Sequence, residues 1–156
     1  MKRITTETII NAPAKLVWQV LTDFDKYSKW NPFMTSVSGL AMVGSEIIVS
    51  IQPPNSRPMI FKPRVLALTP ELELRWKGKM FFSGLFDGEH YFQLNKRGEF
   101  QTQLIHGENF TGVLSGLLLH FIGENTRKGF IGMNEALKNQ SEEIFKGVHN
   151  ENRTVA

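Results

Sequence analysis

The chain begins with a strand-like segment and two helix-like segments. Residues 2–10, KRITTETII, are rich in β-branched residues and predict a strand. Pro13 is followed by apolar residues four apart, which predicts a short helix over residues 13–22. A second short helix, FDKYSKW, should end before Pro32, because the residue before a proline is biased toward extended geometry. We therefore expect one strand followed by two short helices.

Residues 33–110 change to short segments of alternating polarity, separated by glycine and proline turns. In ELELRWKG the apolar side chains Leu74 and Trp76 share one face and the charged side chains share the other, as in a sheet that is packed on one side. When the same alternation is carried back across the turn at residues 69–71, it places Arg64 on the buried face. Successive strands with short links predict an antiparallel meander.

A long helical segment follows a glycine-punctuated apolar stretch, GVLSGLLLHFIG. Five apolar residues form one stripe along this segment: Phe130, Met133, Leu137, Ile144 and Phe145. Beyond Lys146 the sequence is polar, so we expect a single domain over residues 1–147 and a frayed tail over residues 148–156. The pattern predicts an α+β fold, in which a curved antiparallel sheet of about seven strands wraps around the long C-terminal helix.

Length and composition fit one globular domain. With 156 residues, 41% of them hydrophobic, the chain can bury a core, and it has no run of about 20 apolar residues that could span a membrane. The N-terminal segment lacks the apolar core of a secretory signal, so we expect a cytoplasmic protein with no integral membrane segment. The lack of cysteine excludes disulfides and thiolate metal sites. A net charge of +3, from basic residues spread along the chain, gives no reason to expect nucleic-acid binding.

The candidate chemistry lies in two strand-like runs around a glycine turn, FDGEHYFQLNKRGEFQTQLIHGENF. Even-numbered residues of both runs share one face and combine ionisable with apolar side chains: Phe86, His90, Phe92, His106, Glu108 and Phe110. A three-residue loop with Gly98 in the left-handed conformation would join the two runs. In that register His106 lies opposite Gly88. Its neighbours His90 and Glu108 would then be close enough to contact the same small molecule.

Four interpretations of these polar groups are open: the polar part of a ligand pocket, the acid–base groups of an enzyme, a set of satisfied core hydrogen bonds, or a metal site. A buried Glu108 should have a raised pKa unless a cation compensates its charge, and such a group suits proton exchange. A metal site is the least favoured, because the spacing of His106 and Glu108 is common on strands and no fuller ligand set accompanies them. We therefore expect no metal and no cofactor.

Five stretches resemble a known family: IINAPAKLVWQVLTDFDKYSKWNPF, FKPRVLALTPELELRW, FDGEHYFQL, HGENFTGVL and GFIGMNEALK. In this order they are similar to the START-like or SRPBCC superfamily, in particular to its polyketide cyclase/dehydrase and lipid transport branch. The resemblance implies a helix-grip fold with a deep pocket between the sheet and the C-terminal helix, and it implies that Trp30 and Phe33 lie at the pocket mouth. A complete ring-hydroxylating oxygenase is excluded, because the cysteines of a Rieske cluster are missing.

Together, the alternation and the resemblance predict a set of ligand-binding pocket residues: Trp30, Phe33, Arg64, Trp76, Phe86, His90, Phe92, His106, Glu108, Phe110, Phe130, Met133 and Leu137. We expect this pocket to bind a hydrophobic or aromatic small molecule, such as a lipid, a polyketide-like compound or a phenolic one. One alternative is a cyclase or dehydratase that uses His90, His106 and Glu108 as polar or acid–base groups. A second alternative is a regulatory module that binds a protein partner. We expect a monomer or a homodimer.

Overall fold

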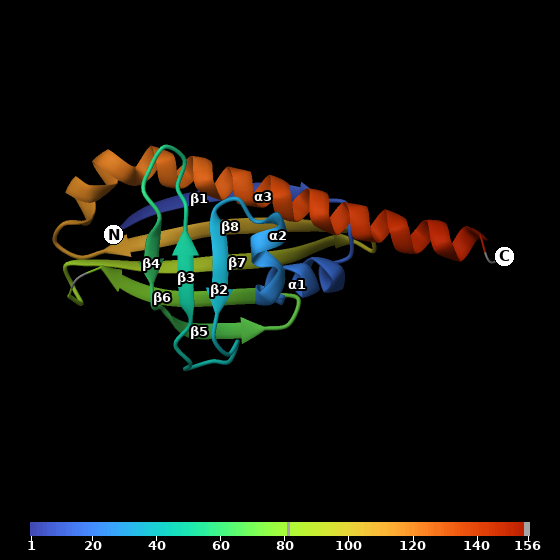
Figure 1. The fold of residues 1–156 in the computed structure, drawn as a ribbon, viewed down its shortest axis with the longest axis horizontal. Helices are drawn as coiled ribbons and strands as arrows, with labels where there is room; N and C mark the ends of the chain where they lie inside the picture. Colours follow the sequence, from blue (N-terminus) through green and yellow to red (C-terminus); the bar gives the residue numbers. More distant parts are fainter. Residues whose placement is uncertain (81, 155–156) are drawn as a thin grey trace.

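The computed structural model describes residues 1–80 and 82–154, which form the predicted α+β fold (Figure 1). In chain order the elements are β1 (Lys2–Ile10), α1 (Ala14–Thr22), the 3₁₀ turn η1 (Phe24–Lys26), α2 (Tyr27–Trp30), β2 (Met34–Ser38), β3 (Ile48–Ile51), β4 (Met59–Phe61), β5 (Arg64–Thr69), β6 (Glu73–Met80), β7 (Phe86–Gly98), β8 (Gln101–Thr111) and α3 (Ser115–Thr154). The predicted order of one strand, two short helices, antiparallel strands and a long C-terminal helix is confirmed.

The strands of the described residues form two sheets. The larger sheet contains five antiparallel strands in the order β1-β8-β7-β6-β5, and β2-β3-β4 form a smaller one. The first strand of the chain thus pairs with the last, with Ile4 opposite Glu108. Figure 1 shows the smaller sheet running crosswise over the larger one, and α3 packs against β1. The two sheets and α3 surround a cavity, whereas the sequence predicted one continuous sheet.

The β7–β8 hairpin keeps the predicted faces but not the predicted register. The chain reverses at residues 99–100, with an irregularity just before Gly98, instead of in a three-residue loop that contains Gly98. His106 therefore lies opposite Phe92, and its predicted pairing with Gly88 is wrong. Because the shift is an even number of residues, the same side chains still face the concave side of the sheet.

A bulge in β5 reverses the predicted orientation of Arg64. Leu68 lies opposite Leu74, but the register shifts just after Val65. The extra residue turns the rest of the strand over, since side chains alternate along a strand. Val65 is consequently buried, whereas Arg64 is exposed and its Nη1 donates a hydrogen bond of 2.8 Å to the carbonyl oxygen of Gly44. The prediction that Arg64 faces the pocket is wrong.

The helix α3 extends beyond both of its predicted ends. The glycine-punctuated stretch is helical from Ser115 onward, and the helical backbone continues to Thr154, past the point where we expected a frayed tail. One glycine has a packing role: a side chain at Gly129 would overlap the ring of Phe33, which lies directly on the helix backbone. The ring contact fixes the small sheet's first strand close to α3.

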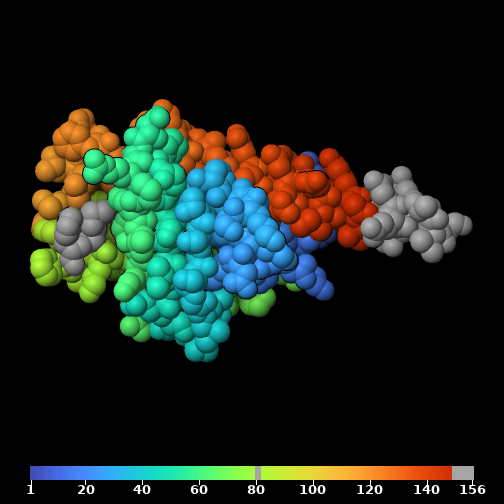
Figure 2. Space-filling view, viewed as in Figure 1, coloured from blue at the N-terminus to red at the C-terminus, as the bar shows by residue number. Residues whose placement is uncertain are grey.

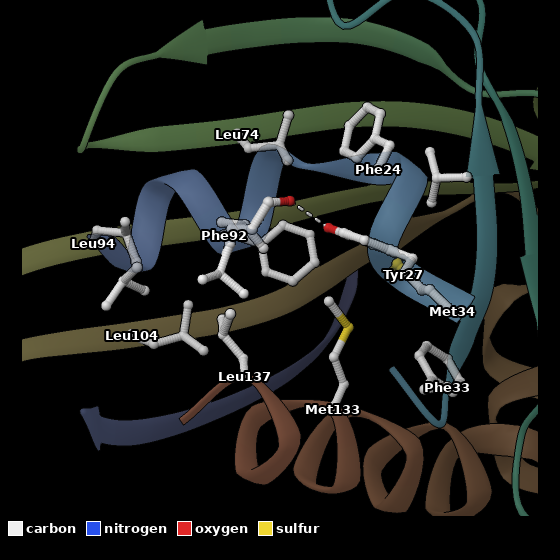
Figure 3. Packing of buried hydrophobic residues seen from close by; sticks show 14 of the residues in the cluster. Phe24, Tyr27, Phe33, Met34, Leu74, Phe92, Leu94, Leu104, Met133 and Leu137 are labelled. Carbon is white, nitrogen blue, oxygen red and sulfur yellow. Dashed lines mark hydrogen bonds between the residues drawn. The ribbon is translucent and has the colours of Figure 1, made fainter. Parts of the chain in front are cut away.

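The first three residues of the predicted α3 stripe pack into the core (Figure 3), whereas Phe145 is partly buried and Ile144 is exposed. Phe130, Met133 and Leu137 are fully buried and belong to the main hydrophobic cluster. Figure 3 shows Met133 and Leu137 directed from α3 toward Phe92 of the larger sheet, with Leu104 beside them. These helix residues therefore hold the sheet and the helix together.

Candidate functional site

A cavity of about 90 Å³ lies between the larger sheet, the smaller sheet and the first half of α3. Its wall is mostly apolar: Phe33, Met34, Val49, Ile51, Met59, Phe61, Pro63, Trp76, Gly78, Lys79, Phe86, Gly88, His90, Glu108, Phe110, Ile122 and Thr126. Figure 2 shows the β3–β4 hairpin (green) against the first part of α3 (orange), where Asn125 donates a 3.4 Å hydrogen bond to Ser56. The smaller sheet and α3 thus close the cavity together.

Part of the predicted pocket set lines this cavity. The residues that do so are Phe33, Trp76, Phe86, His90, Glu108 and Phe110. A second group, predicted as wall, lies in the buried core behind it: Phe92, His106, Phe130, Met133 and Leu137. Trp30 lines a separate surface groove beside α1 and α3, and Arg64 is exposed. For these residues the predicted place in the wall is wrong. The bulge turns Arg64 outward, and for the others the pattern of a strand or helix identifies the buried face but not how far a void extends along it.

The sequence interpretation missed the contribution of the smaller sheet and of the start of α3. The wall residues from these elements are Met34, Val49, Ile51, Met59, Phe61, Ile122 and Thr126. A signal was available for the strands, since Val49 and Ile51, like Met59 and Phe61, are two residues apart and share a face. Ile122 and Thr126 lie eight and four residues before Phe130 and so continue the stripe of α3, but Ile122 falls in the glycine-punctuated stretch that we did not assign to the long helix.

A chain of polar contacts leads from the cavity into the core. Oε2 of Glu108 lies 3.4 Å from Nδ1 of His90, which is directly opposite on the neighbouring strand. Nε2 of His90 lies 2.8 Å from Nε2 of His106. Nδ1 of His106 lies 2.7 Å from Oδ1 of Asn134 in α3. Nδ2 of Asn134 donates to the hydroxyl of Thr6 at 2.9 Å, and this hydroxyl donates to the backbone carbonyl of His106 at 3.1 Å.

The partners in this chain assign a proton to each contact. Thr6 has one hydroxyl proton and gives it to a carbonyl oxygen, so it accepts a hydrogen bond from the amide of Asn134. The amide oxygen then accepts from His106, whose proton is on Nδ1 and whose Nε2 is an acceptor when the ring is neutral. His90 therefore carries its proton on Nε2 and offers a lone pair on Nδ1. A protonated Glu108 completes the chain by donating from Oε2.

Aromatic rings enclose both imidazoles and favour their neutral forms. His90 stacks on Trp76 with 5.4 Å between centroids, and His106 lies between Phe92 and Phe130 at 4.4 and 4.2 Å. Burial lowers the pKa of His90 to about 3. Burial is also the largest cause of the lowered pKa of His106; His90 adds to this shift, while hydrogen bonds with Asn134 and the Phe130 backbone oppose it.

Burial has the opposite effect on the carboxyl group, because its charged form is the deprotonated one. It raises the pKa of Glu108 to about 8, in the direction expected from the sequence. A neutral Glu108 beside a neutral His90 is thus the stable arrangement at pH 7. This protonation state agrees with the one that the hydrogen-bond partners require.

The raised pKa of Glu108 predicts a specific pH dependence of stability. Between the ordinary pKa of 4.5 and about 8, the folded state binds a proton that the unfolded state has lost, so stability falls as the pH rises through this window. Glu108→Gln removes this pH-dependent contribution to the free energy of unfolding, because glutamine does not titrate. The melting temperature of the variant relative to the wild type should therefore rise by about 3 °C or more between pH 5 and pH 9, as measured by scanning calorimetry. A difference that stays constant over this range would mean that Glu108 titrates normally.

Within the described ranges 1–80 and 82–154, no group of three or more His, Cys, Asp or Glu side chains is arranged to hold a metal ion. In the same part of the chain, no helix is both long and apolar enough to cross a membrane. The expectation that the protein uses neither a metal nor a cofactor stays a prediction.

A curved antiparallel sheet gripped by a long C-terminal helix, with a cavity between them, defines the START-like class of proteins. The chain belongs to the polyketide cyclase/dehydrase and lipid transport family, whose model matches residues 1–140. The search of curated proteins finds no match.

Solved structures with the same fold share little sequence with the chain. The Zhui aromatase/cyclase from Streptomyces sp. R1128 is 16% identical, with a TM-score of 0.69 over 90% of this chain and 93% of that one. A START superfamily protein from Mycobacterium smegmatis is also 16% identical, with a TM-score of 0.69 over 91% and 98% of the two chains. A norcoclaurine synthase point mutant from Thalictrum flavum is 12% identical, with a TM-score of 0.69 over 91% and 94%. At these identities the similarity establishes the fold alone.

Proposed function

We propose that the protein binds a hydrophobic or aromatic small molecule in the cavity between the two sheets and α3. The observation that supports this most directly is the composition of the wall, where aromatic and aliphatic side chains surround a single carboxyl group. A mostly apolar pocket with few polar groups is the usual arrangement for orienting an apolar ligand. Membership of a family described by lipid transport and polyketide cyclisation supports the same class of ligand. A partner-binding module would not need such a cavity.

The size of the cavity limits how a ligand can be held. Its volume of about 90 Å³ is smaller than the roughly 150 Å³ of an engineered apolar cavity that takes up benzene. A molecule larger than one ring would therefore extend through the mouth, or the smaller sheet would move away from α3. The hairpin β3–β4 is the element whose movement would enlarge the cavity, because it contributes the wall opposite the larger sheet.

Filling the cavity from α3 should abolish binding without unfolding the protein. Ile122 and Thr126 line the cavity and are partly exposed, so a tryptophan at either position can occupy the void. We expect Ile122→Trp and Thr126→Trp to lower the affinity for apolar ligands at least about tenfold, which corresponds to about 1.4 kcal/mol. Glu124→Trp is the matched control, because Glu124 is exposed on the same helix and does not line the cavity.

Two measurements would check this prediction. Native mass spectrometry of protein purified from its own host would weigh any co-purified ligand, and titration with a panel of lipids and phenols would give affinities. Binding that is equal in the wild type, in both filling variants and in Glu124→Trp would place the ligand elsewhere. If no preparation carries a ligand and no compound of the panel raises the melting temperature, the proposed function fails.

Acid–base catalysis on the bound molecule is the second candidate function. It is favoured by the contact between Glu108 and His90 at the cavity wall and by the pKa of about 8 for Glu108, which suits proton exchange near neutral pH. Enzymes are also named among the proteins of similar fold, an aromatase/cyclase and a norcoclaurine synthase. In this case Glu108→Gln would retain ligand affinity and lose turnover, whereas a carrier has no turnover to lose.

A further inference from the structure

The carboxyl group of Glu108 presents one of its two oxygens to the cavity. Oε2 contacts His90, and 20% of the Glu108 side chain remains exposed. Oε1 overlaps the place that a Cβ atom at Gly88 would take. Gly88 and Glu108 both line the cavity. Among the described residues, none donates a hydrogen bond to Oε1. This oxygen is therefore available to a ligand.

Oε1 is a hydrogen-bond acceptor whether the proton between Glu108 and His90 lies on Oε2 or on Nδ1. With the proton on Oε2, Oε1 is the carbonyl oxygen of a neutral carboxyl group. If the proton moves to Nδ1 of His90, Oε1 becomes part of a carboxylate, which is a stronger acceptor. In neither state does it carry a proton to donate. A ligand atom that contacts Oε1 must therefore be a donor.

Apart from the exposed Lys79, the other polar groups that line the wall among the described residues have no donor left to offer a ligand. Both ring nitrogens of His90 are engaged, by Glu108 and by His106. The hydroxyl of Thr126 donates to the carbonyl oxygen of Ile122 at 2.9 Å, so it too can only accept from a ligand. Lys79 is the remaining charged residue of the wall, and it is exposed. The inner polar position of the cavity is thus an acceptor, surrounded by aromatic rings.

We propose that the cavity selects molecules whose inner end carries a hydroxyl group, as in a phenol, an enol or an alcohol, which donates its proton to Oε1 of Glu108. This specificity rests on the small-molecule binding proposed above. A methyl group in place of the hydroxyl leaves Oε1 without a partner in an apolar site, which costs free energy. A carboxylate at the same place has no proton to give and brings a negative charge toward an acceptor oxygen.

Three probes of similar shape separate hydroxyl recognition from apolar binding: 4-butylphenol, 4-butyltoluene and 4-butylbenzoate. Titration calorimetry with the wild type should show that the phenol binds about tenfold more tightly than the toluene, since one hydrogen bond contributes about 1.4 kcal/mol. The benzoate should bind most weakly. Tightest binding by the benzoate would indicate that Lys79 holds the ligand, and it would overturn the proposal.

Two substitutions of Glu108 test its role in opposite directions. Glu108→Gln can donate from its amide nitrogen to Nδ1 of His90 and still turn its carbonyl oxygen toward the cavity, so the preference for the phenol should be retained. Glu108→Leu keeps a similar volume but has no acceptor, so the preference for the phenol over the toluene should disappear. A preference that survives in Glu108→Leu would contradict the proposal.

A pair of glycine substitutions tests the same point without changing Glu108. Gly88→Ala would displace Oε1 from the wall, because the added methyl group overlaps it, and the preference for the phenol should fall. Gly78 lies directly opposite Gly88 in the sheet and also lines the cavity. A methyl group at Gly78 would meet Pro63 at an ordinary 3.5 Å, so Gly78→Ala should keep the preference.

The outcomes distinguish the two proposals. If the phenol and the toluene bind equally to the wild type, and Ile122→Trp abolishes both, the protein is a small-molecule binder without hydroxyl recognition and the present inference fails. If none of the three probes binds and the wider ligand panel also gives no binding, the proposed function fails and the inference falls with it. Tenfold discrimination that is kept in Glu108→Gln and Gly78→Ala and lost in Glu108→Leu and Gly88→Ala supports both.

Discussion

Replacing Asn134 by alanine should lower the free energy of unfolding by about 3 kcal/mol. The Asn134 amide is the link between the two parts of the buried polar chain: it accepts a hydrogen bond from His106 at 2.7 Å and donates one to Thr6 at 2.9 Å. Without this amide, Nδ1 of His106 and the hydroxyl of Thr6 each lose a hydrogen bond, in a region where the side chains are almost completely buried. Unmade hydrogen bonds of buried groups are among the few causes of such large losses. Urea denaturation would measure the change.

Asn139→Ala is the matched control for this prediction. It makes the same substitution on the same helix at an exposed position, where we expect a change of less than about 0.5 kcal/mol. Nitrogen NMR of the histidines gives a second readout, because the wild type should show a neutral His106 protonated on Nδ1 and a neutral His90 protonated on Nε2. Equal stability of the two variants, or the reverse tautomers in the wild type, would contradict the assigned chain.

The sequence predicted which sides of β7 and β8 are buried, because side chains alternate along a strand whatever the pairing partner. It could not predict the register of the hairpin, which depends on an irregularity just before Gly98 and a reversal at residues 99–100. The orientation of Arg64 failed for a related reason. Alternation holds only while a strand is regular, and the bulge after Val65 adds one residue.

Asn134 and Thr6 could have been recognised from their spacing. Asn134 lies four residues after Phe130 and seven before Ser141, so it falls on the buried stripe of α3 as a polar residue among apolar ones. Thr6 shares its face of β1 with Ile4 and is likewise buried among apolar neighbours. A polar side chain at such a position must find a partner. The partner could not be named from the sequence, because the pairing of β1 with β8 and the rotation of α3 are set by tertiary packing.

The same limit applies to the cavity. The sequence identified the apolar stripe of α3 but not the part of it that faces a void. Phe130, Met133 and Leu137 lie where the helix packs against the larger sheet, and the helix lines the cavity about one and two turns before Phe130, at Thr126 and Ile122. That division depends on where the smaller sheet crosses the helix, which no local pattern encodes.

Met133→Trp should therefore destabilise the protein by about 3 kcal/mol or more, in contrast to Ile122→Trp. Met133 is fully buried in the main hydrophobic cluster and does not line the cavity, so the larger side chain has no free space to enter. Overpacking forces side chains off their rotamers and shifts the backbone, which costs about 1–3 kcal/mol for smaller volume increases than this one. At Ile122 the added volume enters a void, and we expect a loss below about 1 kcal/mol.

Met133→Leu is the control that separates volume from chemistry at this position. It conserves volume and apolar character, so it should cost less than about 1.5 kcal/mol. Denaturation of the three variants under one set of conditions would rank them, with Met133→Trp clearly the least stable and Ile122→Trp the only one that loses ligand binding while still folded. A stable Met133→Trp that also blocks the ligand would mean that the void reaches the middle of α3. The core around Phe92 and Phe130 would then be part of the binding site, and the buried histidines would be open to the ligand.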